Sequence, residues 1–245
     1  MNAQIDVAPV EENPGETGET LGPGAKSLRP AGTQRNAAAT RQRILDVAMA
    51  EFAEHGFSGS RIERISAGAR VNVGMIYHYF GNKDDLYLAA LEASYKVIRD
   101  AEQTLDVSDA DPVLALQALI ELTFDFLSAD PYFVRLIMNE NLMMGRAAAR
   151  SSTIPHMARP LLGSLRLLLA RGQEEGRFRR NVEAEELYIS ILGLCFIHVS
   201  NKYTLGSMFQ HDLSQPGWLE KRRDIVIDVV TRYVAQPSDG SLAAI

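Results

Sequence analysis

Apolar residues recur at the helical period along most of this chain. Between residues 36 and 55, Ile44, Ala48 and Phe52 follow one another at four-residue spacing and form one apolar stripe. Gly56 follows the stripe, in the position just past a helix end where glycine is common. The pattern predicts a helix over residues 36–55.

Two short helices separated by a tight turn are expected next. The order Ser60-Arg61-Ile62-Glu63 fits a capping box that opens the first helix, which reaches about Gly68. Asn72 is a good N-cap for the second helix, whose Ile76 and Phe80 share one inward face. The opposite face carries Val73, Gly74, Met75, Tyr77, His78 and Tyr79. This mixture of exposed aromatic, thioether and imidazole groups indicates a helix that contacts another molecule.

Longer helical patterns fill the remainder of the chain. Asp-Pro pairs at residues 111–112 and 130–131 mark two helix starts, because proline is tolerated in the first turn. The expected helices cover residues 83–106, 112–128, 131–144, 154–172, 181–203 and 217–235, with a flexible connection over residues 145–153 and loops over residues 176–180 and 206–216. No stretch alternates with the period of a strand, so the sequence predicts an all-α protein.

The helices expected over residues 181–203 and 217–235 carry more apolar surface than one neighbouring helix would cover. Two interpretations remain open, namely burial within one chain and a four-helix seam formed with a second copy. The size of the protein in solution distinguishes them.

Charge divides the chain into three parts. The formal net charge is −6, which is unusual for a protein that binds DNA. Residues 1–25 hold five acids and no bases, whereas residues 26–83 hold nine bases and four acids and are net +5. Residues 84–245 are net −6. The positive charge therefore surrounds the two short helices, and its local concentration matters more for contact with nucleic acid than the total.

The composition indicates in which cellular compartment the protein works. The single cysteine excludes an internal disulfide and is typical of a reducing environment. The first residues are acidic and contain no apolar block, and the longest apolar run, residues 187–199, is too short to span a bilayer. We therefore expect a cytoplasmic protein without membrane contact. Residues 1–35 lack periodicity and are rich in Gly, Pro, Glu and Ala, which predicts a disordered extension.

The residues around the turn follow a specific order. Between Arg41 and Leu86 the chain reads R-x-x-I-L-x-x-A, then E-F-x-x-x-G-F, then I-x-x-I-S, then V-x-V-G-x-I-Y-H-Y-F-x-x-K-x-x-L. This order resembles the N-terminal domain of the TetR family of bacterial repressors, at surface positions as well as core positions. The resemblance implies a three-helix helix-turn-helix domain over residues 36–83 and a larger helical ligand-binding and dimerisation domain over residues 84–236, followed by a tail over residues 237–245.

The resemblance also implies a function. A homodimer would bind a double-stranded DNA operator and act as a transcriptional repressor that a small-molecule effector releases. Carried over onto this sequence, the second short helix would enter a major groove. The residues implied to face the bases are Val73, Gly74, Met75, Tyr77 and His78, and those implied to hold phosphates are Ser60, Asn72, Tyr79 and Lys83. Arg61 is a further DNA-binding residue implied by the resemblance.

Two positions depart from the family's pattern. Arg70 stands in the turn where glycine or asparagine is usual, and Val73 replaces a commonly polar residue. A positive φ at Arg70 would cost about 1 kcal/mol relative to glycine.

The second expected domain contains aromatic and methionine side chains that can repack around an apolar ligand. Ordinary core is the alternative interpretation of each one. The candidates for a ligand pocket are Phe124, Phe133, Met138, Met157, Tyr188, Phe196, His198 and Asn201. His198 and Asn201 are polar residues on an otherwise apolar helix.

Signals for other chemistry are weak. Cys195 and His198 lie three residues apart on one face, but no third or fourth metal ligand accompanies them, and neither a metal nor a cofactor is expected. The chain has no G-x-S-x-G, phosphate loop, dinucleotide fingerprint or H-E-x-x-H, so an enzyme is not expected. Two alternatives remain open, an activator of the same fold and a helical adaptor or enzyme that lacks salt-dependent DNA binding.

Overall fold

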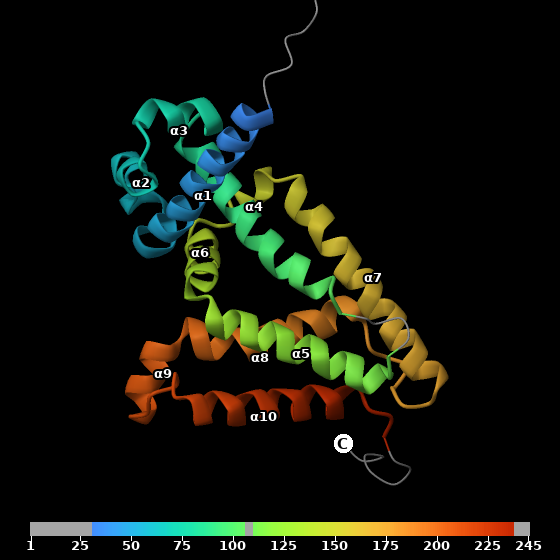
Figure 1. The fold of residues 1–245 in the computed structure, drawn as a ribbon. Coiled ribbons are helices and arrows are strands. Elements are labelled where there is room, and N and C mark those ends of the chain that lie inside the picture. Colours follow the sequence, from blue (N-terminus) through green and yellow to red (C-terminus); the bar gives the residue numbers. More distant parts are fainter. Residues whose placement is uncertain (1–30, 106–109, 238–245) are drawn as a thin grey trace, which may run out of the picture.

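The computed structural model describes residues 31–105 and 110–237, with side chains described from residue 36 onward (Figure 1). Its elements are α1 (Ala31–Gly59), α2 (Ile62–Ala69), α3 (Val73–Phe80), α4 (Lys83–Glu102), α5 (Pro112–Ala129), α6 (Pro131–Leu142), the short 3-10 helix η1 (Ala148–Arg150), α7 (Thr153–Glu174), α8 (Ala184–Ser200), α9 (Lys202–Phe209) and α10 (Pro216–Val234). The predicted all-α class is confirmed. Extended pairing within the described residues is limited to one isolated bridge between Phe178 and Ala235.

Part of the predicted disordered extension, residues 1–30, lies outside the described residues, as do residues 238–245 of the predicted tail. Residues 31–35 belong to α1, which therefore begins before the predicted start at residue 36. Gly56 has φ 66°, which confirms that the first regular helical segment ends there, although the helix is resumed as far as Gly59.

A small head domain is formed by α1, α2, α3 and the first part of α4. Figure 1 shows these helices gathered at one end of the molecule, with α4 leading away from them. One buried cluster unites them and includes Ile44, Phe52, Ile65, Ile76 and Leu86, none of which is more than 1% exposed. The phenyl ring of Phe52 also meets the ring of Tyr87 edge-on, with centroids 4.9 Å apart. The head is therefore a packed unit that fixes the position of α3.

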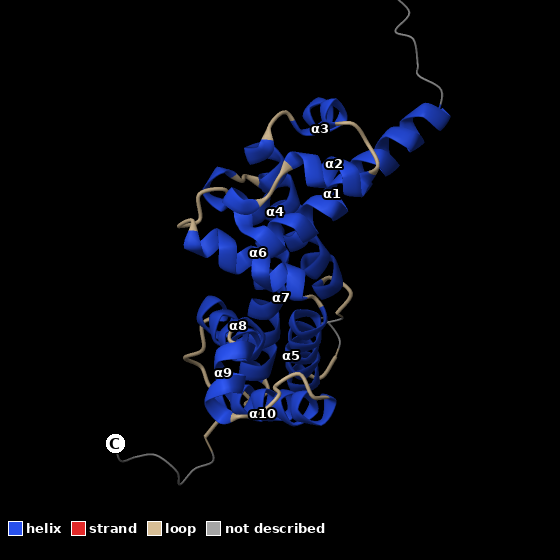
Figure 2. Cartoon of the chain, turned by 90° about the vertical axis from the view of Figure 1, so that its left-hand side faces the viewer, coloured by secondary structure: helices blue, strands red, loops and turns tan. Residues whose placement is uncertain are grey.

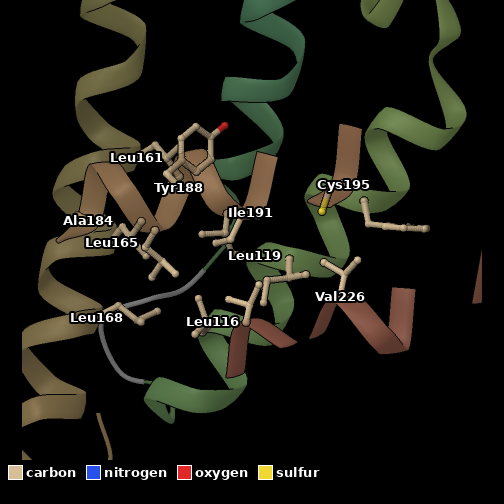
Figure 3. Packing of buried hydrophobic residues seen from close by; sticks show 14 of the residues in the cluster. Leu116, Leu119, Leu161, Leu165, Leu168, Ala184, Tyr188, Ile191, Cys195 and Val226 are labelled. Atoms are coloured by element: carbon tan, nitrogen blue, oxygen red, sulfur yellow. The ribbon is translucent and has the colours of Figure 1, made fainter. Parts of the chain in front are cut away.

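In the body α5, α8 and α10 pack against one another as a group of three helices, and α7 lies beside α4 (Figures 1 and 2). Its core is rich in leucine and joins α5, α7, α8 and α10 (Figure 3). Among the described helices, α5 is long and apolar enough to cross a membrane by length and composition alone, and 44% of that stretch is buried inside the protein. Leu116 and Ile120 of α5 are fully buried at the centre of the body, which is the pattern of a core helix.

Side-chain caps explain where several helices begin. The Asn72 Oδ1 atom accepts a hydrogen bond from the Met75 N–H at 2.9 Å, which confirms the predicted N-cap of α3. Asp111 and Asp130 cap α5 and α6 in the same way, each followed by a proline in the first turn as predicted.

The predicted capping box at Ser60 is wrong. The N-cap of α2 is Arg61, and the Ser60 hydroxyl donates instead to the Phe57 carbonyl at 2.8 Å. At this helix start the Oε1 atom of Glu51 in α1 accepts a hydrogen bond from the N–H of the N-cap residue Arg61 at 2.9 Å. A tertiary contact thus satisfies the helix terminus that a local motif was expected to satisfy.

The helix predicted over residues 181–203 is also wrong in extent. Helix α8 ends at Ser200, and α9 follows after Asn201, so that residues 206–209 of the predicted loop are helical. Residues 145–153 form an ordered connection where a flexible one was expected. The Glu140 Oε1 atom accepts hydrogen bonds from the N–H groups of Ala147 and Ala148 at 2.7 and 2.9 Å.

Candidate nucleic-acid interface and ligand cleft

Helix α3 buries one face and presents the other. Ile76 and Phe80 are 1% and 8% exposed, whereas Tyr77 is 48% exposed and His78 is also exposed. Val73, Met75 and Tyr79 are half-buried, and Gly74 leaves the backbone open at the helix start. The predicted division of this helix into an inner and an outer face is confirmed by its burial.

The turn before α3 is strained at Arg70, which lies in the left-handed region with φ 54° and ψ 47°. Its N–H donates to the Ala67 carbonyl, so the residue closes the end of α2. Gly68 lets α2 approach α1 closely, because a Cβ atom there would lie 2.8 Å from the Val47 Cγ1 atom. Arg70 itself is exposed beside the start of α3.

Glu51 braces the outer side of this motif. Besides the Arg61 N–H, its carboxylate accepts a hydrogen bond from the Arg64 Nε atom at 2.8 Å. Burial alone would raise the pKa of Glu51, but the hydrogen bonds from Arg64 and Arg61 outweigh it and hold that pKa below its usual range. Sequence reasoning gave Glu51 no role, although it stands at a matched position of the family pattern.

Two of the predicted phosphate-binding residues are engaged within the head. Ser60 is 4% exposed, and its carbonyl accepts a hydrogen bond from the Lys83 Nζ atom at 2.7 Å. The same ammonium lies 4.8 Å from the centroid of the Phe57 ring. Burial lowers the pKa of Lys83. Lys83 thus ties the start of α4 to the start of α2. Arg61 and Asn72 are both exposed.

Comparison with known proteins identifies both parts of the chain. Residues 44–90 match the family described as bacterial regulatory proteins, tetR family, and residues 112–230 match the tetracyclin repressor-like C-terminal domain. The chain is also 35% identical over 192 residues to the HTH-type transcriptional repressor NicS of Pseudomonas putida, covering 77% of this chain and 91% of that protein. The chain belongs to the TetR family. This TetR-family protein is accordingly a DNA-binding transcriptional regulator and not an enzyme.

Other relatives agree with this assignment. The HTH-type transcriptional repressor SCO4008 of Streptomyces coelicolor is 33% identical over 162 residues, covering 65% of this chain and 78% of that protein. A TetR transcriptional regulator from Chloroflexus aurantiacus superposes with a TM-score of 0.63 at 19% identity, over 83% of this chain and all of that one. FadR from Bacillus subtilis, solved in complex with stearoyl-CoA, superposes with a TM-score of 0.58 at 20% identity, over 79% of this chain and 98% of that one. These structural likenesses concern the fold alone.

The body of this TetR-family protein contains an apolar cleft of about 350 Å³ between α4, α6 and α8. Phe133 and Phe196, two of the predicted ligand residues, lie in its wall. Sequence reasoning missed the other lining residues, which are Tyr95, Ile98, Arg99, Leu127, Ile137, Asn141, Ile189, Leu192 and Gly193. The cleft falls in the size range of small-molecule sites, from about 300 to 1,000 Å³.

A buried polar cluster borders this cleft. The Arg99 Nη1 atom donates to the Glu102 Oε2 atom at 2.6 Å, and the Arg99 Nη2 atom donates to the Tyr188 hydroxyl oxygen at 2.8 Å. That hydroxyl donates in turn to the Glu102 Oε1 atom at 3.1 Å. Burial raises the pKa of Glu102, against the opposing effect of Arg99. Figure 3 shows the Tyr188 hydroxyl pointing away from the leucine-rich core.

The remaining predicted ligand residues do not gather around the cleft. Met157 lines a separate small cavity of about 30 Å³ between α4 and α7, and Met138 lies 37% exposed on α6. Asn201 occupies the junction of α8 and α9, where its side-chain N–H donates to the Ser200 hydroxyl at 2.8 Å. The predicted set is therefore scattered over several sites.

His198 and Phe124 belong to the core between α5 and α8. Their rings stack with centroids 4.5 Å apart, and the His198 Nε2 atom lies 3.1 Å from the Ser128 hydroxyl oxygen. The His198 Nδ1 atom has no hydrogen-bond partner among the described residues. Burial, assisted by the positive charge of Arg222, lowers the pKa of His198 to about 4. The imidazole is therefore neutral at physiological pH.

Cys195 lies in the same region, on α8, and the described residues around it do not form a metal site. Its thiol is buried, and burial raises its pKa to about 12. Among residues 31–105 and 110–237, no group of three or more His, Cys, Asp and Glu side chains is placed to hold a metal ion.

Proposed function

We propose that this protein is a cytoplasmic repressor that binds its operator as a homodimer and leaves the operator when a small molecule fills the cleft between α4, α6 and α8. The observation that carries the DNA-binding part is the outer face of α3, where Tyr77 and His78 are exposed on a helix anchored by buried Ile76 and Phe80. Relatives named as transcriptional repressors support the direction of regulation.

The proposed base contacts come from the half-buried or exposed residues along α3. Tyr77 and His78 offer hydrogen-bonding groups, whereas Val73 offers only an apolar contact, for example with a thymine methyl group. Arg61, Asn72 and Tyr79 would hold phosphates, helped by the N–H groups at the start of α3. Ser60 and Lys83 would contribute to DNA binding indirectly, because the hydrogen bond between them joins the start of α2 to the start of α4.

The proposed dimer uses the outer faces of α8 and α10. Large apolar side chains are exposed there: Ile197, Ile225, Val229 and Tyr233 are between 42% and 46% exposed. A hollow between the two helices is lined by Leu194, Val229 and Tyr233 among others. A contiguous apolar surface on two adjacent helices favours a self-complementary seam.

Helix α6 supports the proposed coupling, because it touches both the cleft and the head. Phe133 and Ile137 line the cleft. On another side of the same helix, Leu136 is buried in the head cluster. The Asn139 Nδ2 atom donates to the Phe52 carbonyl at 3.1 Å. A ligand that displaces α6 would therefore move α1 and, through it, the reading helix α3.

The test compares two tyrosines of equal exposure. Tyr77 is 48% exposed on α3, and Tyr132 is 49% exposed on α6. We expect Tyr77→Ala to weaken operator binding by about tenfold or more, because a lost base or phosphate contact is worth about 1–3 kcal/mol. Tyr132→Ala serves as the control and retains wild-type affinity. A gel shift on the operator, with folding checked by circular dichroism, measures both, and equal affinities for the two variants would refute the assignment of α3.

A further inference from the structure

Arg99 is an unusual member of the cleft wall. It is 8% exposed and lies near the end of α4. The cleft is otherwise walled mainly by aliphatic and aromatic side chains, and Arg99 is its one charged lining residue within the described parts of the chain. A buried charge is costly, and it persists where it is paired or where it binds a ligand.

The internal partners of Arg99 leave part of its bonding capacity unused. A guanidinium carries five N–H donors and no acceptor. Its side-chain hydrogen bonds within the described residues, to Glu102 and to Tyr188, occupy two of those donors. Neither Glu102 nor Tyr188 lines the cleft, so the group that a bound molecule meets from this cluster is the cation and not its counter-ion.

The other polar residues of the wall fit the same kind of ligand. Tyr95 and Asn141 can both donate hydrogen bonds, and Arg99 can only donate. A molecule that binds the Arg99 guanidinium must present an oxygen acceptor to it and an apolar surface to most of the remaining wall. Arg recognises planar anionic groups such as carboxylates best, because its N–H groups form a matching fork.

We propose that the effector is an apolar molecule carrying one carboxylate or chemically similar anionic oxygen group, and that this group binds the Arg99 guanidinium from the cleft. The proposal rests on the cleft being the effector site. The anion accepts hydrogen bonds from guanidinium donors that Glu102 and Tyr188 leave unused, while the apolar part fills the space beside α6.

Two fluorescent dyes of nearly the same shape test the proposal. Anilinonaphthalene sulfonate carries an anionic group, and N-phenylnaphthylamine is its neutral analogue. The variant is Arg99→Met together with Glu102→Met, which removes both charges of the buried pair and avoids leaving an unpaired carboxylate. The matched control is Lys96→Met with Asp100→Met, which removes an exposed pair from the same helix.

We expect the Arg99/Glu102 variant to bind the sulfonate dye about tenfold or more weakly than the wild type and to bind the neutral dye within about twofold, because only the sulfonate loses a charge-assisted hydrogen bond. The Lys96/Asp100 control binds both dyes as the wild type does. Phe196→Ala, which alters the cleft wall without altering charge, weakens both dyes together.

Three results would overturn the proposal. If the ratio of the two dye affinities is the same in the Arg99/Glu102 variant as in the wild type, Arg99 does not bind an anionic group, although the cleft can still be the effector site. If the Lys96/Asp100 control changes that ratio by the same factor, the effect comes from the charges of the protein in general and not from Arg99. Indifference of both dyes to Phe196→Ala, or no binding of either dye by the wild type, would reject the cleft itself; DNA binding is judged separately by the operator gel shift with Tyr77→Ala.

Discussion

At the scale of single residues, Arg70 combines a strained backbone with an exposed charge. Its φ of 54° places a residue with a Cβ atom in the region that glycine adopts at no steric cost. The turn also sits beside the start of α3, where a phosphate would bind. The strain is therefore tolerated at a position where arginine adds a positive charge to the proposed interface.

Two substitutions separate these effects. Arg70→Gly and Arg70→Ala both remove the charge, but only alanine retains the steric cost of the left-handed conformation. We expect the free energy of unfolding of Arg70→Gly to exceed that of Arg70→Ala by about 1 kcal/mol. Chemical denaturation measures it, and equal stability of the two variants would contradict the strain. If Arg70 binds a phosphate, both variants show the same shallower salt dependence of operator binding.

His198 makes stability depend on pH. Its pKa is lowered from 6.5 to about 4 in the folded protein, so the unfolded chain binds the extra proton first as the pH falls. The stabilisation is therefore fully present above pH 6.5 and is lost as the pH falls from there to about 4. We expect His198→Phe to flatten the decline of the unfolding free energy in this window, as measured by urea denaturation at several pH values. An unaltered decline would show that other groups cause it.

At the scale of elements, sequence reasoning succeeded where the information was local. Asn72 caps α3, and prolines 112 and 131 open α5 and α6, because the capping side chain and the capped N–H lie within one turn. It failed at α2, because Glu51 reaches that helix start from α1. It also failed at Asn201, where an apolar pattern continues across the break between α8 and α9.

The residues that line the cleft between α4, α6 and α8 were predicted only in part, for the same reason. Phe133 and Phe196 were predicted from their residue type. Arg99 was not predicted, because it is held beside the cleft by a hydrogen bond to Tyr188, which is 89 residues away in the sequence. A signal was present in the sequence: Arg99 and Glu102 continue the apolar stripe of Leu91, Tyr95 and Ile98. A charge pair at inward positions of a helix indicates a buried polar cluster.

Helix α6 permits a test of its contact with the head. We expect Asn139→Ala to lower the free energy of unfolding by about 1 kcal/mol, because the Phe52 carbonyl loses a partner. Amide hydrogen exchange should quicken near the end of α1 and remain unchanged in α10. Asn141→Ala is the control, since the Asn141 side chain bonds the Ile137 carbonyl within its own helix. Equal exchange near the end of α1 in both variants would show that α6 and α1 are not coupled through Asn139.

At the scale of the whole molecule, the proposed dimer would hold two basic heads at a fixed spacing. Major-groove half-sites recur about 34–36 Å apart or at multiples of that distance. The apolar outer faces of α8 and α10 are the surface through which we expect that spacing to be set.

A charge placed on this surface tests the dimer. We expect Val229→Glu to sediment as a monomer and to lose most of its operator affinity, because a carboxylate in an apolar seam is unpaired. Leu167→Glu on α7 is the control, since Leu167 is also exposed, at 64% against 46% for Val229. Sedimentation velocity measures both variants, and a dimeric Val229→Glu would place the seam elsewhere.

The continuity of α4 has a mechanical consequence. The helix joins Lys83 in the head to Arg99 and Glu102 in the body without an intervening linker. Its 20 residues span about 30 Å, so a tilt of roughly 5° about one end displaces the other by roughly 2–3 Å. Hydrogen bonds to base edges tolerate only about 0.5 Å of variation in length. An angular change too small to disturb the packing of either domain would therefore take the two reading helices out of register with the duplex.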